Sequence, residues 1–353
     1  DYYRAFLSGV EPFASVRIPA FDLGAKFYGR AGKGTNLGIL TTQDYSGRND
    51  TVVTLAQQFS PFTTLDLQAV RLGMGKGPQG GVDNTVTALQ GSYGRGTWGF
   101  DVGGAHSGDL SGAGDAAGAD LFWNSKAWFA GGGYQWISPN FQARDGYAPF
   151  TDEMGANAGF GYGSPWRSGP IRQFNAGINL SRYLHTDGRF FNDDISLYLN
   201  LRTVKSLGLS ASYDNNHFEL NHDHLYDITL RYPALDKFRN VSMDFAWGTQ
   251  DGSPYTALGP AINWRFHRRL TLNAASQIVN LNGSQHQHVV SINYEMSKDR
   301  AIGGRLVRRN GKMNWYLSYR RSGYGGTEYF IIWGDPNADT FKNRLVFKVV
   351  RQF

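Results

Sequence analysis

Apolar and polar residues alternate with a period of two along most of the chain. Leu270 and Leu272, for example, alternate with Thr271 and Asn273. The same arrangement recurs over further segments, at 195–202, 226–231, 241–247, 262–266, 290–296 and 313–320, and with more irregularity at 26–30, 65–68 and 98–102. Because successive side chains of a strand point to opposite faces, each segment predicts a strand with one apolar and one polar face. No stretch of useful length has a period of 3.6, so we expect an all-β protein.

Turn-forming residues separate these segments. They include Lys33-Gly34, Ser60-Pro61, Arg95-Gly96, Ser297-Lys298-Asp299, Asn310-Gly311 and Gly325-Gly326. The segments between them are about ten residues long, which is the length that a tilted membrane strand needs. No linker divides the chain, so residues 1–353 are predicted to form one domain.

The average hydropathy and the residues on the polar face favour a membrane protein built from strands. The mean hydropathy is −0.41 and no window approaches eighteen apolar residues, which excludes helical spans but not a transmembrane β-barrel. Aromatic residues recur near the ends of the apolar face, as in an interfacial girdle. They are Trp247, Trp264, Phe266, Tyr294, Tyr319 and Trp333.

The connections predict the topology of such a barrel. Tight turns at 95, 205–206, 267–269 and 297–299 interleave with longer polar loops at 74–83, 107–116, 215–224 and 250–257. Short turns belong on the periplasmic side and long loops outside. With a final strand near 341–353 and another at 155–166, the stretch 138–154 becomes an external loop. We expect one closed antiparallel barrel of about 20 to 22 strands, within a range of about 16 to 22, and an even number.

The C-terminus carries a local signal of its own. Leu345, Phe347, Val349 and Phe353 fall on alternate positions, and only Arg351 interrupts the apolar row. This pattern resembles the terminal signal that the barrel assembly machinery recognises in outer-membrane proteins. The machinery, outer-membrane lipid and lipopolysaccharide are therefore expected partners.

Four segments carry a resemblance to a known family. They are Gly-Ala-Lys-Phe-Tyr-Gly-Arg at 24–30, Ser-Pro-Asn-Phe-Gln-Ala-Arg-Asp-Gly-Tyr at 138–147 followed by Thr151-Asp152, Glu-Tyr-Phe-Ile-Ile-Trp at 328–333, and Arg-Leu-Val-Phe-Lys-Val-Val at 344–350. In this order they resemble outer-membrane barrels that usually follow a family-nine-type carbohydrate-binding domain. The resemblance implies a fold and a bacterial outer-membrane location, but no activity. Because the chain begins at Asp1 without a signal-like segment, we expect a signal peptide, alone or with that periplasmic domain, upstream of residue 1.

The amino-acid composition excludes several kinds of functional site. The chain has no cysteine, which excludes disulfides, cysteine-ligated zinc, iron–sulfur clusters, thiol nucleophiles and covalently attached haem. No cofactor is expected. The net charge is +6, but Lys and Arg are spread along the chain without a basic block, so nucleic acid is not an expected partner.

Charged residues on the polar face are the candidate lining of a pore. Cations outnumber anions there, which favours anionic solutes. The predicted lining residues are Lys26, Arg30, Arg202, Arg231, Arg265, Arg305 and Arg320 with Asp66, Asp101, Asp227, Asp244 and Glu295.

Histidines supply the only candidates for a metal site. His217, His222 and His224 fall in one predicted loop with acidic neighbours, a composition that suits a divalent metal. The alternative is an ordinary polar loop, because no ligand-fixing motif such as HExxH occurs. No catalytic residue is predicted, since His106 and Ser107 are adjacent and point to opposite faces of a strand.

Three functions remain open. The first is a channel for small polar or anionic solutes, narrowed by the loop 138–154. The second is a structural barrel that holds a plug or a partner, such as a sheath for a periplasmic or haem-bearing protein. The third is an outer-membrane hydrolase.

Overall fold

The computed structural model describes residues 11–13, 21–45, 47–74, 83–110, 112–146, 148, 150–166, 168–323 and 326–351. These residues form 21 strands that belong to one hydrogen-bonded sheet, with no α-helix among them. In the described part of the chain, no helix has the length and apolarity to cross a membrane. The predicted all-β class is confirmed. The 21 strands of the described residues lie within the predicted range, but their number is odd where an even number was expected.

The strands follow the expected segments most closely in the C-terminal half. Their bounds are β1 Leu23–Gly32, β2 Thr35–Gln43, β3 Arg48–Ser60, β4 Thr63–Met74, β5 Asn84–Arg95, β6 Trp98–Asp109, β7 Gly112–Asn124, β8 Trp128–Ile137, β9 Glu153–Pro165, β10 Ile171–Leu184, β11 Phe190–Thr203, β12 Gly208–Phe218, β13 Asn221–Tyr232, β14 Arg239–Gln250, β15 Ser253–His267, β16 Leu270–Asn280, β17 Ser284–Ser297, β18 Arg300–Arg309, β19 Lys312–Ser322, β20 Thr327–Gly334 and β21 Leu345–Arg351.

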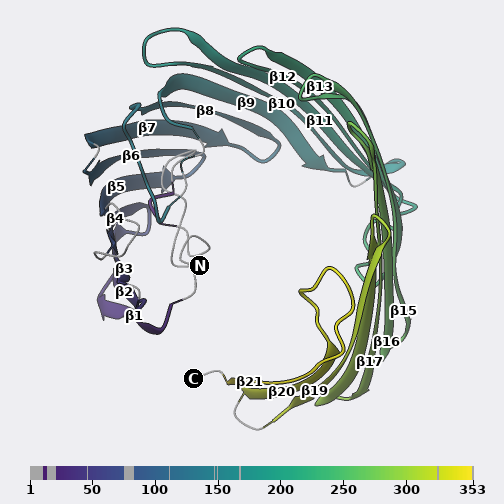
Figure 1. Cartoon of the computed structure of the whole chain (residues 1–353). Helices are drawn as coiled ribbons and strands as arrows, with labels where there is room; N and C mark the ends of the chain where they lie inside the picture. Colours follow the sequence, from purple (N-terminus) through teal and green to yellow (C-terminus); the bar gives the residue numbers. More distant parts are fainter. Residues whose placement is uncertain are drawn as a thin grey trace. The chain divides into compact units, whose positions relative to one another are not determined.

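The chain divides into two compact units. Unit 1 holds residues 1–162, 178–195 and 217–220, and unit 2 holds 163–177, 196–216 and 221–353. From β1 to β9, and again from β13 to β21, each strand pairs in antiparallel fashion with the next strand along the chain (Figure 1). Pairing between chain neighbours needs only short connections, as the turn signals predict.

The registers of unit 2 sort the side chains into two faces. Residues directly opposite each other in an antiparallel pair project on the same side of the sheet, so the face of Asp227 can be followed from strand to strand. Asp227 lies opposite Ala246, two residues from Asp244. Continuing through the registers, the same face holds Arg231, Asp244, Arg265, Glu295, Arg305 and Arg320. We call this the polar face of unit 2.

The registers of unit 1 give the same separation. Lys26 and Arg30 of β1 lie opposite Leu40 and Asn36 of β2. From there the face continues to Asp66 of β4 and Asp101 of β6. These four predicted residues therefore share one face, the polar face of unit 1.

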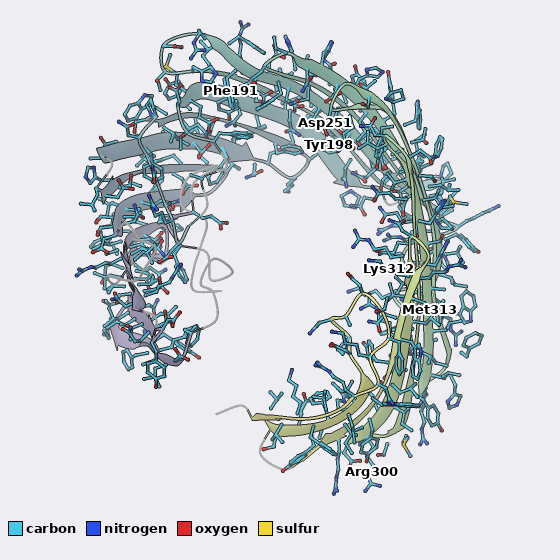
Figure 2. All side chains as sticks on the ribbon, viewed as in Figure 1. Phe191, Tyr198, Asp251, Arg300, Lys312 and Met313 are labelled. Carbon is cyan, nitrogen blue, oxygen red and sulfur yellow. The ribbon has the colours of Figure 1, made fainter. Side chains whose placement is uncertain are left out.

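The opposite face of both units is apolar and exposed. Ile292 and Leu317 in unit 2 are 48% and 46% exposed, and Phe100 in unit 1 is 45% exposed. At the start of β19, the side chains of the consecutive residues Lys312 and Met313 lie on opposite faces of the sheet (Figure 2). A protein surrounded by water rarely presents so large a continuous apolar surface.

Several predicted long loops prove to be short. The segments 107–116, 215–224 and 250–257 continue as strands and turn only at 110–111, 219–220 and 251–252. Polar composition made them resemble loops, but their backbones remain paired in the ladder. Longer connections do occur at 75–83, 138–152 and 335–344. The final strand is shorter than predicted and begins at Leu345.

The turn between β18 and β19 illustrates the local chemistry. Asn310 and Gly311 both have positive φ, 46° and 83°, the backbone of the two-residue turn that Asn-Gly favours. A Cβ atom added at Gly311 would meet nothing within 4 Å, and the same holds for Gly108 inside β6, whose φ is not positive.

We expect Gly311→Ala to lower the free energy of unfolding by about 1 kcal/mol, because a side chain disfavours this backbone conformation. Gly108→Ala, the matched control, should leave that free energy unchanged or slightly raised. Denaturant unfolding of the two variants measures the difference. An equal effect of both substitutions would contradict a left-handed turn at Gly311.

Candidate functional site

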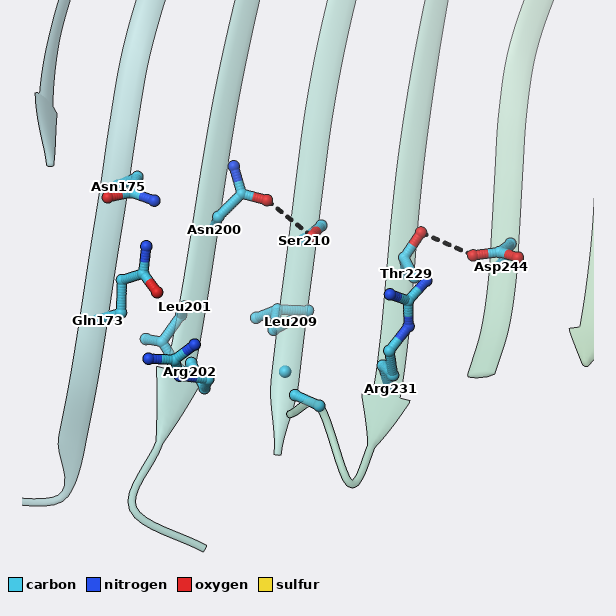
Figure 3. A pocket seen from close by; sticks show the side chains of 12 residues that line it. Gln173, Asn175, Asn200, Leu201, Arg202, Leu209, Ser210, Thr229, Arg231 and Asp244 are labelled. Atoms are coloured by element: carbon cyan, nitrogen blue, oxygen red, sulfur yellow. Dashed lines mark hydrogen bonds between the residues drawn. The ribbon is translucent and has the colours of Figure 1, made fainter. Parts of the chain in front are cut away.

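A polar pocket lies in unit 2 across β10 to β14. It has a volume of about 430 Å³ and is lined by side chains from five neighbouring strands (Figure 3). Its polar members are Gln173, Asn175, Asn200, Arg202, Ser210, Thr229, Arg231 and Asp244. Three of these, Arg202, Arg231 and Asp244, are predicted lining residues, and the structure brings them together.

Hydrogen bonds fix part of this lining. Ser210 Oγ donates to Asn200 Oδ1 at 2.7 Å, and Thr229 Oγ1 donates to Asp244 Oδ1 at 2.7 Å. Each bond joins neighbouring strands, so the acceptor oxygens are held in place by the ladder. The amide nitrogen of Asn200 is not used in the bond with Ser210.

The two arginines of the pocket lack protein partners. Within the described ranges, neither Arg202 nor Arg231 forms an ion pair or a hydrogen bond, and Arg202 Nε is buried without an acceptor. A buried donor without an acceptor costs about 1 to 3 kcal/mol. The arginines therefore offer guanidinium donors that the protein itself does not satisfy.

The other predicted arginines of the polar face of unit 2 have different surroundings. The Arg265 guanidinium lies 4.1 Å from the centre of the Phe238 ring. Arg320 is 3.8 Å from the Glu328 carboxylate, although its Nε is buried without an acceptor like that of Arg202. Arg305 is exposed. A concentration of unpaired positive charge therefore occurs at the pocket rather than evenly along the face.

In unit 1, the connection between β8 and β9 packs onto the polar face. Phe141 is 1% exposed and belongs to a buried cluster with Val52, Val70 and Val86. A Cβ atom at Gly114 of β7 would lie 2.2 Å from Phe141 N, so only glycine leaves room for this approach. We call residues 138–146 the inserted segment.

Polar contacts hold the inserted segment at several points. Gln142 N donates to Ser107 Oγ at 2.9 Å, and Asn84 Nδ2 donates to Gln142 O at 3.1 Å. The Arg144 side chain donates to Asp109 Oδ2 at 3.1 Å. The contacts come from β5 and β6, so the segment is attached to strands far from it in the sequence.

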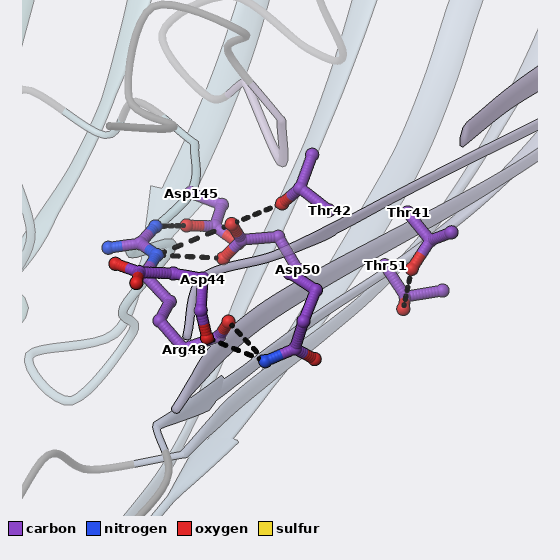
Figure 4. Close-up of polar contacts among 8 residues, drawn as sticks. Thr41, Thr42, Asp44, Arg48, Asp50, Thr51 and Asp145 are labelled. Atoms are coloured by element: carbon purple, nitrogen blue, oxygen red, sulfur yellow. Dashed lines mark hydrogen bonds and ion pairs between the residues drawn. The ribbon is translucent and has the colours of Figure 1, made fainter. Parts of the chain in front are cut away.

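A buried charged cluster secures the end of the inserted segment. Arg48 lies between Asp50, at 3.0 Å, and Asp145, at 2.6 Å, while Thr42 donates to Asp50 (Figure 4). The Asp145 side chain is fully buried, and its Oδ2 has no hydrogen-bond partner. One guanidinium thus faces two carboxylates.

Burial and the neighbouring charge of Asp50 together raise the pKa of Asp145 to about 7, although the Arg48 guanidinium acts in the opposite direction. The cluster is therefore a titratable contact of the inserted segment.

The histidines predicted as metal candidates have separate polar partners. His217 Nδ1 is 3.9 Å from Asp193 in unit 1. In unit 2, His222 Nε2 lies 2.8 Å from Asn215 Oδ1, and His224 Nδ1 lies 3.2 Å from Thr249 Oγ1. No group of three or more potential metal ligands occurs among the residues that the structure describes.

The structure also separates the adjacent His106 and Ser107. His106 Nδ1 is 2.7 Å from Asp115 on the apolar face, whereas Ser107 is on the polar face beneath the inserted segment. Leu345, Phe347 and Val349 share the exposed face of β21. Phe353 lies outside the described residues.

The chain matches no protein-family model and has no significant sequence match to a curated protein. The resemblance based on the motifs at 24–30 and 138–147 therefore stays a prediction.

Sequence reasoning missed the residues that hold the inserted segment. Arg48 and Asp50 carry no motif, and Asp145 appeared only as part of the segment 138–147 without a role of its own. The contact between Arg48 and Asp145 spans 97 positions. The available signal was an aromatic residue, Phe141, between the polar residues Asn140 and Gln142 in a connection expected to be exposed. An apolar anchor in a polar loop indicates that the loop packs against something.

We expect the inserted segment to loosen as the pH rises. While the segment is packed, Asp145 has a raised pKa and keeps its proton. When the segment is released, the same carboxyl loses that proton near its ordinary pKa of 3.8. The stabilisation is therefore complete below a pH of about 4 and is lost as the pH rises to about 7. Amide exchange in 138–146, corrected for its intrinsic rate, should lose roughly tenfold or more of its protection over this range.

Two variants control this prediction. Asp145→Asn cannot titrate, so its protection should not change between these pH values. Asp109→Asn removes the contact to Arg144 and should lower protection at every pH while keeping the decline. A decline that persists in Asp145→Asn would show that another group is responsible.

Proposed function

We propose that the protein is a bacterial outer-membrane β-barrel that forms a channel for small polar solutes, with a preference for anions. The observation that carries this proposal is the separation of faces by register. One face exposes apolar side chains along strand after strand, while the other carries charged and amide side chains. Lipid on one side and water on the other account for both faces.

The backbone supports closure of the sheet into a barrel. In hydrocarbon, each unpaired backbone N–H or C=O group costs several kcal/mol. A sheet whose apolar face is in lipid therefore cannot leave the free edges of its first and last strands unpaired. The polar faces would then line a lumen.

Charge on the polar face supports the preference for anions. Arg202 and Arg231 have no carboxylate partner among the described residues, while Asp244 already accepts a hydrogen bond from Thr229. Unpaired guanidinium groups raise the local concentration of anions. The inserted segment, which lies on the polar face of unit 1, would narrow the passage from within.

The remaining partners follow from the same proposal. Leu345, Phe347 and Val349 are each more than half exposed on one face of β21, which suits recognition of the last strand by the assembly machinery. The surrounding partners would be lipid and lipopolysaccharide. A periplasmic domain upstream of residue 1 remains part of the proposal through the family resemblance.

We expect Ile292→Arg to lower the free energy of unfolding by about 2 to 4 kcal/mol in lipid vesicles, because it places a charge on the lipid face. Asn293→Arg adds the same side chain one position along on the polar face of β17. Its cost should stay within about 0.5 kcal/mol. Denaturant unfolding followed by tryptophan fluorescence measures both, and equal costs would contradict a lipid-facing side of β17.

Current through planar bilayers tests the channel directly. The purified protein should give discrete conductance steps, with a reversal potential in a salt gradient that favours chloride. Removal of residues 139–146 should raise the conductance of each step, because the inserted segment no longer occupies the polar face. A protein that is folded in the bilayer but passes no current, or that strongly prefers cations, would overturn the proposal. The first of these results would favour a barrel that holds a partner.

A further inference from the structure

The pocket across β10 to β14 contains several hydrogen-bond donors that have no acceptor within the described part of the protein. In the described part of the chain, the side chains of Gln173, Asn175, Arg202 and Arg231 form no hydrogen bond or ion pair. The amide nitrogen of Asn200 is also free, because Ser210 occupies only its oxygen. These donors belong to adjacent strands, so an external acceptor can meet several of them at once.

The charge of the pocket limits the kind of acceptor. Two guanidinium groups face one carboxylate, and the carboxylate of Asp244 is partly satisfied by Thr229. Arginine presents a planar set of donors that matches an oxyanion in two-point contact. A neutral solute would leave the positive charges of Arg202 and Arg231 without a counter-charge.

The side-chain amides of the pocket indicate the chemistry of the remaining groups of the solute. Side-chain amides both donate and accept, so Gln173, Asn175 and Asn200 suit hydroxyl groups, which do the same. The volume of about 430 Å³ accommodates a molecule larger than a simple inorganic ion. Ligand binding by aromatic stacking is not indicated, because no aromatic side chain lines the pocket.

We propose that this pocket is a binding site for small hydroxylated carboxylates, with the carboxylate on Arg202 and Arg231 and the hydroxyl groups on the three amides. The inference rests on the proposed function in so far as the pocket then lies along the solute path. It names the class of solute that the channel retains longest. Binding itself does not require current, so the two proposals can be tested separately.

Calorimetric titration of the detergent-solubilised protein with gluconate tests the site. Gluconate should bind and glucose, which has hydroxyl groups but no carboxylate, should not. Arg202→Ala should weaken gluconate binding about 10- to 100-fold, as expected for loss of hydrogen bonds to a charged group. Arg202→Lys, which keeps the charge but loses the planar donors, should also bind more weakly than the natural protein.

Arg308→Ala is the matched control. It removes the same charge from an exposed position on the opposite, apolar face of β18, so gluconate binding should be unchanged. Equal binding of glucose, or an equal loss in Arg308→Ala, would overturn the proposal. Inorganic phosphate that binds through Arg202 while gluconate does not would overturn it too, because the site would then be a simple oxyanion site.

In bilayers, gluconate should reduce the chloride current through the natural protein but not through Arg202→Ala. A conducting protein that binds no gluconate refutes the binding site and leaves the channel standing. A protein that binds gluconate but passes no current refutes the channel and leaves the site standing.

Discussion

The hydrogen-bonded register between neighbouring strands is the constraint on which the rest of the structure depends. Side chains alternate along a strand with a period of two, so a slip of one residue would exchange the two faces completely. In the pairing of β17 with β18, for example, Ser291 lies opposite Arg305 and Ile292 opposite Gly304. The same ladder that satisfies the backbone therefore keeps every charged residue of the polar face away from the apolar one.

The period of two predicted most strands of the C-terminal half, such as β16, β17 and β19, but no segment was identified at the positions of β3, β7, β8 and β10. Asn310-Gly311 was recognisable because its turn needs two residues with positive φ. The prediction failed where polarity alone suggested loops, as at 215–224, because a strand can continue in water when its neighbour still pairs with it. Polar composition reports exposure and does not report whether the backbone is paired.

The irregular pattern in the N-terminal half has a physical cause that the local sequence could not reveal. Val52, Val70 and Val86 occupy the polar face because the inserted segment covers them with Phe141. Their environment is set by a contact between positions far apart in the sequence, as is that of Asp145. Likewise, parity placed Arg202 and Arg231 on a polar surface, but only the arrangement of five strands brings the amides of β10 and β11 to them.

The arginines of the two polar faces differ in their carboxylate partners, and this difference bears on function. Arg48 is neutralised by two carboxylates, one of them fully buried, where the chain must hold a segment in place. Arg202 and Arg231 have no such partners among the described residues, although a carboxylate lies in the same pocket. A guanidinium that serves stability gains from a permanent counter-charge, whereas one that receives a solute must keep its donors free. The chain contains both arrangements, so the unpaired pair is better explained by binding than by a general shortage of acidic residues.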